Sequence, residues 1–294
     1  MSVAVLTDST ACLPTEQARG AGVEVVPLHV LVGRESRSEG VDITADEVAA
    51  LLRKGKVRVS TSRPAPGELV QAYRALAERT GCDAIASIHL SSRMSGTIEA
   101  AQLAAAAVRR EVRVEVLDTR VIGMAMGYAV LSAAQTAAAG AGVEQVLETA
   151  RTRAGEGSLF FYLDTLDHLR RGGRIGPAAA FFGSALAIKP LLQLSDGEVQ
   201  PLEKVRTRTK ALARLEQRCV EVAEELRDDG REIDVAVHHL GWQERAETLR
   251  DHLAERLPGA GLDLVELGAV VGVHTGPATL AVVVSPRPRQ PDPG

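Results

Sequence analysis

Short apolar runs and longer helical patterns alternate along the first half of the chain. The apolar runs predict strands, and segments with apolar residues at every third or fourth position predict helices. The expected strands and extended stretches are residues 3–6, 23–32, 84–90 and 112–117. The expected helices are residues 44–53, 67–79, 96–109, 124–139 and 143–153. This alternation indicates a parallel sheet with helices on both of its faces.

Two local signals sharpen the boundaries in this half. Thr44 and Glu47 have the spacing of a capping box, which marks the start of a helix. Pro64 and Pro66 keep residues 61–66 out of helix, because proline lacks a backbone N–H and restricts the residue before it. A loop is therefore expected between residue 60 and the helix that begins near Gly67.

The second half of the chain mixes hairpin and crossover patterns. The expected strands are residues 158–163, 189–194, 198–202, 233–239, 263–267 and 279–285, and the expected helices are residues 165–171, 207–226 and 243–256. Asp196-Gly197, between two of these strands, is typical of a hairpin turn. Hairpins give antiparallel pairs and crossovers give parallel ones, so a mixed sheet is expected.

Together these patterns predict an α/β fold with two α/β domains. Residues 1–155 form the first domain, with a largely parallel sheet, and residues 156–286 form the second, with a mixed sheet. Residues 286–294 contain four prolines, so we expect a disordered tail at residues 287–294.

The amino-acid composition also constrains the interior of the protein. Hydrophobic residues make up 45% of the 294 residues, but aromatic residues make up only 3%. The cores must therefore be aliphatic, and an aliphatic wall cannot stack on a flat ring. This favours an alkyl ligand over a nucleotide base or a flavin, although the codon bias of a GC-rich genome would give the same composition.

Charge and cysteine content exclude several classes of protein. The net charge of −4 and a pI of about 6.0 lack the basic footprint of a nucleic-acid-binding protein. Cys12, Cys82 and Cys219 lie far apart and form no CxxC pair, which favours a reducing, cytoplasmic compartment. The N-terminus has no basic region typical of a signal peptide. Residues 121–139 are apolar but interrupted by polar side chains, so we expect a buried helix and no membrane insertion.

Common catalytic motifs are absent from the sequence. It has no P-loop, no GxGxxG after the first strand, no GxSxG elbow and no HExxH. His238 and His239 are adjacent on an expected strand, so their side chains point to opposite faces and cannot hold one metal ion. One core and one surface histidine are expected, and neither a metal nor a cofactor is predicted.

Small polar clusters instead follow or precede the expected strands. These clusters are Thr7-Asp8-Ser9-Thr10, Thr61-Ser62, Ser91-Ser92-Arg93-Met94-Ser95-Gly96-Thr97 and Gly272-Val273-His274-Thr275-Gly276-Pro277. Ligands of open α/β sheets bind beyond the carboxyl ends of the strands. Three of the four clusters fall where that rule places a site.

The Ser95-Gly96-Thr97 turn is the most informative cluster. Glycine lets the backbone approach a ligand closely, and free N–H groups at a helix start attract an anion. Ser95 and Thr61 add hydroxyl donors, so the pattern suits a carboxylate or a phosphate. The alternative is that Ser95 or Thr97 merely caps the helix.

Taken together, these clusters resemble the DegV family of bacterial fatty-acid-binding proteins over about residues 2 to 285. The segments that carry the resemblance are residues 7–14, 61–64, 90–97, 169–175, 189–190, 204–207 and 272–277. Studied members of the family act as the acyl-carrying subunit of fatty acid kinase. Each segment alone is a weak signal, but all of them in this order make a specific match.

The resemblance implies a ligand and a set of site residues. One long-chain fatty acid would lie in a tunnel between the two domains, with its carboxylate at Thr61, Ser95, Gly96 and His274. A separate kinase subunit carrying ATP would phosphorylate that carboxylate, giving an acyl-phosphate for phospholipid synthesis. This chain would then be a lipid-binding subunit with no nucleotide site of its own.

Further residues are assigned around this head-group site. Two arginines are expected to dock the kinase, Arg174 and Arg206. Ser62, Met94, Thr97, Met124 and Met126 are candidates for the pocket wall or the layer behind it, since methionine adapts to an alkyl chain. Ordinary core packing is the alternative for the methionines, and a solvated helix end is the alternative for Arg174.

The sequence departs from the family pattern at three positions. Arg63 stands where the family usually has glutamine, Gly123 replaces a serine, and Ala278 replaces a glycine. None of these changes removes a head-group residue, but they leave the acyl-chain preference open.

Two other functions fit the residues. A stand-alone lipid hydrolase would use Ser95 and His274 with Asp8 or Asp118, because such a site is defined by geometry and not by sequence order. A lipid-sensing regulatory protein is the third hypothesis. For Asp8 and Asp118, a structural hydrogen-bond network is favoured over catalysis.

Overall fold

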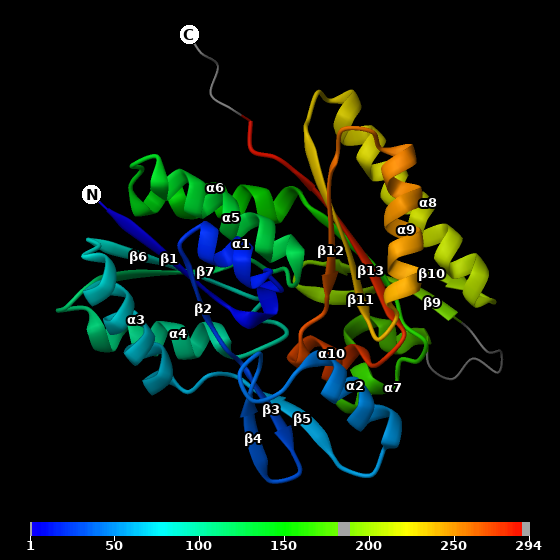
Figure 1. Ribbon diagram of the computed structural model, residues 1–294, viewed down its shortest axis with the longest axis horizontal. Helices are drawn as coiled ribbons and strands as arrows, with labels where there is room; N and C mark the ends of the chain where they lie inside the picture. The colour runs from blue at the N-terminus through cyan, green and yellow to red at the C-terminus, as the bar shows by residue number, and fades with distance from the viewer. Residues whose placement is uncertain (1, 182–188, 290–294) are drawn as a thin grey trace.

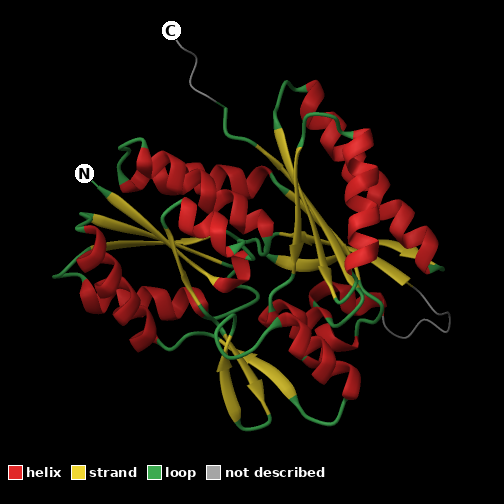
Figure 2. Ribbon diagram, in the orientation of Figure 1, coloured by secondary structure: helices red, strands yellow, loops and turns green. Residues whose placement is uncertain are grey.

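A computed structural model describes residues 2–181 and 189–289 of the chain. Within this part, the strands form three sheets, and helices surround the two larger ones (Figure 1). The two larger sheets lie side by side, and the small third sheet lies beneath the place where they meet (Figure 2).

The first sheet is parallel throughout, as predicted. Its strand order is β2-β1-β6-β7, with bounds Val23–Val26, Val3–Asp8, Ala84–His89 and Arg113–Asp118. One face packs on α3 (Pro66–Thr80) and α4 (Thr97–Val108). The other face packs on α5 (Met124–Ala138) and α6 (Val143–Glu156). Alternate residues of β1 serve the two faces: Leu6 packs with α3 and α4, and Val5 with α5 and α6.

The second sheet is mixed, also as predicted. Its order is β10-β9-β8-β13-β11-β12, with bounds Glu198–Val205, Lys189–Ser195, Ser158–Tyr162, Thr279–Pro286, Ile233–Leu240 and Gly261–Glu266. Only β11 and β12 pair in parallel; the other neighbours are antiparallel. The helices α8 (Arg208–Asp228) and α9 (Gln243–Arg256) cover one face. The other face turns toward the first half of the chain.

The third sheet was not predicted. Residues 23–32 were expected as one extended stretch, but they form two strands in different sheets, β2 and β3 (His29–Val32). Pro27 lies between them and has no N–H for a strand ladder, while the N–H of Leu28 donates to Ser9 Oγ at 3.0 Å. The strand β3 pairs with β4 (Glu35–Ser38) and with β5 (Val59–Ser62).

Short helices connect these layers. They are α1 (Thr15–Gly20), α2 (Ala45–Lys54), α7 (Asp167–Arg171), α10 (Ala269–Thr275) and two 3-10 turns, η1 (Ser9–Ala11) and η2 (Gly176–Phe181). The capping box at Thr44 is confirmed, with both of its hydrogen bonds present. The helix α10 was not expected; it packs against α2, the small sheet and α7.

The predicted domain boundary and the predicted tail lie next to the ends of α6 and β13. The division near residue 155 falls next to the end of α6 at Glu156 and stays a prediction. The last strand continues to Pro286, and Arg287 forms ion pairs with Asp234 and Glu232. The disordered tail at residues 287–294 stays a prediction. Residues 290–294 of the expected tail lie outside the described residues. Among the helices that the structure describes, none has the length and apolar character needed to cross a membrane.

Candidate functional site

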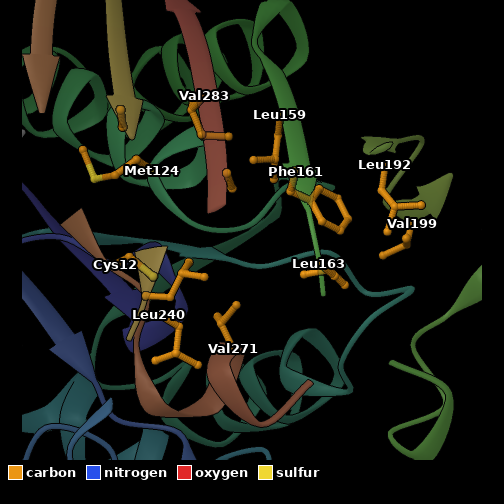
Figure 3. Close-up of a cluster of buried hydrophobic side chains, with 14 of the residues drawn as sticks. Cys12, Met124, Leu159, Phe161, Leu163, Leu192, Val199, Leu240, Val271 and Val283 are labelled. Atoms are coloured by element: carbon orange, nitrogen blue, oxygen red, sulfur yellow. The ribbon is translucent and has the colours of Figure 1, made fainter. Parts of the chain in front are cut away.

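A cavity of about 280 Å³ lies between the two large sheets. Most of its wall is aliphatic. The apolar lining residues are Leu28, Leu90, Met94, Ile122, Leu159, Phe161, Leu169, Leu194, Val199, Leu267, Val270, Val271 and Ala281. Figure 3 shows how Leu159 and Phe161 from β8 approach Val199 on one side, with Val271 of α10 below. Pockets with apolar walls and few polar groups are typical of small-molecule sites.

Thr61 and His274 meet at one end of this cavity. The Thr61 hydroxyl lies 2.8 Å from Nε2 of His274, although the two residues are 213 positions apart. The residue Thr61 lies on β5, and His274 is in the last turn of α10, so the unpredicted sheet and the unpredicted helix create the pair. Both residues line the cavity.

Ser95 and Gly96 line the cavity at the start of α4. The Ser95 hydroxyl lies 2.9 Å from the Thr97 hydroxyl, and the Thr97 N–H donates to Ser95 Oγ at 3.3 Å. Among the described residues, no acceptor is found for the Gly96 N–H. The positive end of α4 therefore faces the cavity with a free donor, an arrangement that attracts an anion.

The side chain of Arg63 packs closely on Gly96. A Cβ atom at residue 96 would lie 2.1 Å from Nη1 of Arg63. This guanidinium donates to Gly96 O at 2.8 Å and to Glu99 at 2.7 Å. Arg63, which stands where the family usually has glutamine, thus places a cation on the cavity wall beside the start of α4.

His274 is neutral at ordinary pH. Burial, with a smaller contribution from the nearby cation of Arg174, lowers the pKa of His274 to about 4. Its Nδ1 is buried and has no partner among the described residues. A neutral ring that donates from Nε2 to the Thr61 oxygen leaves the Thr61 hydroxyl hydrogen free for a ligand.

The Gly172-Gly173 pair has a separate physical reason at each position. A Cβ at residue 172 would lie only 2.1 Å from Nδ1 of His274, so glycine lets α7 pack against the ring. Gly173 has a φ of +70°, which side chains rarely adopt. The motif therefore positions His274.

The two arginines expected to dock a partner lie in different places. The Arg174 side chain lines the cavity, and it donates from Nε to Met94 O at 2.9 Å and from Nη1 to Gly172 O at 2.6 Å. It therefore joins α7 to the loop before α4. Both arginines are exposed, but Arg206 lies after β10 and does not line the cavity.

The candidates for the pocket wall divide into three groups. Ser62 and Met94 line the cavity, and Thr97 lies directly behind Ser95. Met124 and Met126 do not line it: both are fully buried, in the cores that pack α5 against its neighbours. The positions of these two methionines correspond to the alternative of ordinary core packing, because their side chains lie in the cores around α5.

His238 is a wall residue that the sequence did not indicate. It accepts a hydrogen bond from the Met124 N–H at Nε2 (3.0 Å), with Nδ1 3.2 Å from Val265 O, and burial lowers its pKa to about 4. The expectation of one core and one surface histidine is wrong, since His239 is also buried, at 7% exposure. Two adjacent histidines on a strand do not indicate whether both faces of that strand are covered by other elements.

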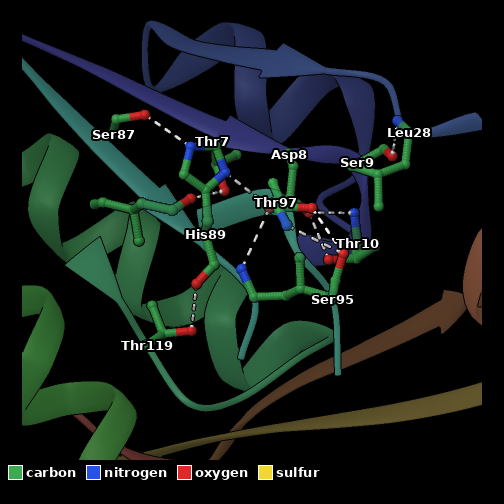
Figure 4. A network of polar contacts seen from close by, with 12 residues as sticks. Thr7, Asp8, Ser9, Thr10, Leu28, Ser87, His89, Ser95, Thr97 and Thr119 are labelled. Atoms are coloured by element: carbon green, nitrogen blue, oxygen red, sulfur yellow. Dashed lines mark hydrogen bonds and ion pairs between the residues drawn. The ribbon is translucent and has the colours of Figure 1, made fainter. Parts of the chain in front are cut away.

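Asp8 and Asp118 have structural partners, as favoured from the sequence. Asp8 accepts from Thr10 and lies 2.9 Å from Nδ1 of His89, whose Nε2 lies 2.7 Å from Ser87 (Figure 4). Asp118 accepts from the N–H groups of Ser92 and Arg120. Neither aspartate contacts His274, so no Ser-His-Asp relay is assembled around this histidine among the described residues.

These features define an α/β protein with a largely apolar cavity between two sheets and a polar, anion-attracting end. Residues 2–287 match the model of the DegV family, and the chain belongs to this family. A DegV domain-containing protein of Streptomyces coelicolor is 50% identical over 286 residues, which cover 97% of this chain and 99% of the relative.

Solved structures of the family agree with the fold. A DegV family protein of Thermus thermophilus, described as binding fatty acid, is 33% identical, with a TM-score of 0.88 over 97% of this chain and 100% of that one. DegV of Bacillus subtilis, described as a fatty acid binding protein, is 32% identical, with a TM-score of 0.86 over 97% and 99%. A stearic-acid-binding protein of Eubacterium ventriosum is 25% identical, with a TM-score of 0.87 over 96% and 98%.

Proposed function

We propose that this protein binds one long-chain fatty acid in the cavity and presents its carboxylate to a separate ATP-dependent fatty acid kinase subunit. The product would be an acyl-phosphate for phospholipid synthesis. The observation that carries the proposal is the combination of a largely aliphatic wall with a group of polar residues that includes Thr61, Ser95, Gly96 and His274. The fatty acids bound by three structural relatives support the same ligand class.

The tail and the head group have different roles in this proposal. Each buried CH₂ contributes about 0.8 kcal/mol, so roughly 14 methylenes contribute on the order of 11 kcal/mol before ordering and desolvation costs. A buried carboxylate without donors would be costly. The hydroxyls of Thr61 and Ser95 and the N–H of Gly96 offset that cost and fix the orientation of the head group.

The alternative of a stand-alone hydrolase has little support. A nucleophilic serine needs a base within hydrogen-bonding reach. His274 instead contacts Thr61, and Ser95 contacts Thr97. Ser95 is therefore placed as a donor at a helix start and not as an activated nucleophile. No feature of the described residues favours a regulatory role over a carrier role.

Native mass spectrometry of the protein purified under mild conditions tests the ligand. We expect one bound fatty acid per chain, and Ser95→Ala combined with Thr61→Val should reduce its occupancy severalfold. Ser92→Ala is the matched control, since Ser92 lies in the same loop but is exposed, and its hydroxyl has no contact with the cavity. Absence of lipid after incubation with fatty acid would refute the proposal, as would equal occupancy in all variants.

The kinase step needs a separate test. Acyl-phosphate can be trapped with hydroxylamine after incubation with a fatty acid kinase subunit and ATP. Because Arg206 is exposed and outside the cavity, Arg206→Ala should keep the bound lipid and lose turnover. Arg174→Ala should affect both, because the Arg174 side chain also holds the loop at Met94. Arg171→Ala, a change at an exposed neighbour, is the control. Full turnover by Arg206→Ala would exclude this docking role.

A further inference from the structure

Two guanidinium groups hold the loop that leads into α4. Arg174, which follows α7, donates from Nε to Met94 O at 2.9 Å. Arg63, which follows β5, donates from Nη1 to Gly96 O at 2.8 Å. The two cations are therefore attached to carbonyls on either side of Ser95 in the sequence, and both arginines line the cavity.

The charge of the cavity wall is unbalanced. Among the described residues that line the cavity, Arg63 and Arg174 are positively charged, and none is an aspartate or a glutamate. Burial lowers the pKa of both lining histidines, His238 and His274, to about 4, so they add no charge at neutral pH. Glu99 forms an ion pair with Arg63 at 2.7 Å, but its side chain is 74% exposed and does not line the cavity. The loop before α4 therefore lies beside two cations, of which Glu99 compensates at most one.

Arg63 has hydrogen-bond donors left for a ligand. Within the described part of the chain, only its Nη1 is hydrogen-bonded, to Gly96 O and to Glu99, so Nε and Nη2 have no partner there. The guanidinium lies so close to Gly96 that a Cβ at this residue would be 2.1 Å from Nη1 and 3.0 Å from Cζ. The Gly96 N–H at the positive end of α4 also has no acceptor among these residues. A free backbone N–H at a helix start beside a guanidinium is an arrangement that suits a phosphoryl group.

A carboxylate alone does not match the charge of these groups. It carries one negative charge, and the donors already assigned to it are Thr61, Ser95 and Gly96. A phosphoryl group carries a charge of about −1.5 to −2 near pH 7 and has three acceptor oxygens. A guanidinium can bind two of these oxygens through parallel hydrogen bonds, which the point charge of a lysine cannot do. Two cations and one planar fork therefore fit a phosphorylated head group better than a carboxylate.

We propose that Arg63 is the specificity-determining residue of a phosphate subsite beside the carboxylate site, with Arg174 as its second cation. The chain then holds a single-chain lipid with a phosphorylated head group more tightly than the free fatty acid. This inference rests on the proposed function, because the alkyl chain occupies the same cavity. It adds that the phosphorylated product stays on this protein until an enzyme that consumes it takes it away.

Displacement of a fluorescent fatty acid by palmitate or by hexadecyl phosphate tests the subsite, with both ligands kept below the concentrations at which they form micelles. The two ligands have chains of equal length and differ in the head group. We expect wild-type protein to bind hexadecyl phosphate at least about fivefold more tightly than palmitate. Arg63→Gln should remove this preference and change palmitate binding by less than about twofold. Arg63→Lys keeps the charge without the planar fork and should keep part of the preference.

Arg74→Gln is the matched control. Arg74 is also about half exposed and paired with a carboxylate, that of Glu111, but it does not line the cavity. The same change of charge there should leave both affinities unchanged. The melting temperature of each variant checks that its fold is intact.

Three results would overturn the inference and leave the proposed function intact. The first is equal affinity of the wild-type protein for the two ligands. The second is an equal loss of both ligands in Arg63→Gln, which would make Arg63 a general support of the loop. The third is the same loss of preference in Arg74→Gln, which would assign the preference to the overall field of the protein. Failure of palmitate to compete with the fluorescent fatty acid in wild-type protein would contradict the proposed function itself.

Discussion

Replacement of Gly172 by alanine tests the head-group geometry with the smallest possible change. Residue 172 has φ −78° and ψ −10°, an ordinary helical conformation, so alanine causes no backbone strain. The added Cβ would instead lie 2.1 Å from Nδ1 and 2.8 Å from Cε1 of His274. Ordinary contact begins at 3.4 Å, and the difference requires the ring to withdraw by about 1.3 Å.

A displacement of this size disrupts the Thr61–His274 hydrogen bond. Its length is now 2.8 Å, and hydrogen bonds of this kind tolerate only about 2.7–3.2 Å. Loss of one such bond costs about 1 kcal/mol, which corresponds to roughly fivefold weaker binding. We therefore expect Gly172→Ala to stay folded and to lose fatty acid about five times more readily, measured by displacement of a fluorescent fatty acid.

Gly155→Ala is the matched control. Gly155 lies within α6, is exposed, and has no atom within 4 Å of an added Cβ. The same substitution there should stabilise the protein by about 0.4–1 kcal/mol and leave binding unchanged. Wild-type affinity in a folded Gly172→Ala protein would show that His274 does not hold the head group in the proposed way.

Three further outcomes follow from the structure. Burial lowers the pKa of His238 and of His274 from 6.5 to about 4, so protonation favours the unfolded state. The free energy of unfolding should therefore be highest above pH 6.5 and fall toward pH 4 by roughly 3 kcal/mol per histidine. Urea unfolding at pH 7.5 and 5 checks this, and equal stabilities would contradict it. Phe161→Ala, at a site 7% exposed, should cost about 3–5 kcal/mol and is measured in the same assay; a loss below 1 kcal/mol would mean that the cavity wall relaxes freely. Asp234→Ala leaves the buried guanidinium of Arg153 without its carboxylate and should cost about 3–5 kcal/mol, seen as a lower melting temperature; an unchanged value would show that Ser132 and Ser285 satisfy it alone.

The two large sheets were predictable because their strands are specified locally. Buried strands such as Ala84–His89 are continuous apolar runs, and helices between them have clear starts such as Thr44. Errors arose where tertiary contacts decide the conformation. Residues 23–32 are extended on both sides of Pro27, but they belong to two different sheets. No local pattern states which sheet a strand joins.

The site could be predicted only in part for the same reason. The start of α4 at Ser95-Gly96 is visible in the sequence, since glycine and hydroxyl residues open a helix there. The role of Arg63 on the wall and the placement of Met124 and Met126 in the cores depend on which side of each element faces the cavity. Resemblance to a family supplied the pairing of Thr61 with Ser95 and the place of His274, which no spacing rule connects.

The sequence by itself determined the two-part α/β character, the aliphatic interior and an anion-attracting turn, because periodicity, composition and helix capping act over a few residues. The tertiary structure alone decided which polar residues meet. Thr61 and His274 are 213 positions apart, and they come together because β5 and α10 pack against each other. It also decided that Gly172 lies against the ring of His274, and that His238 lines the cavity while the neighbouring His239 does not. Contacts between distant segments depend on the packing of whole layers, which no local pattern specifies.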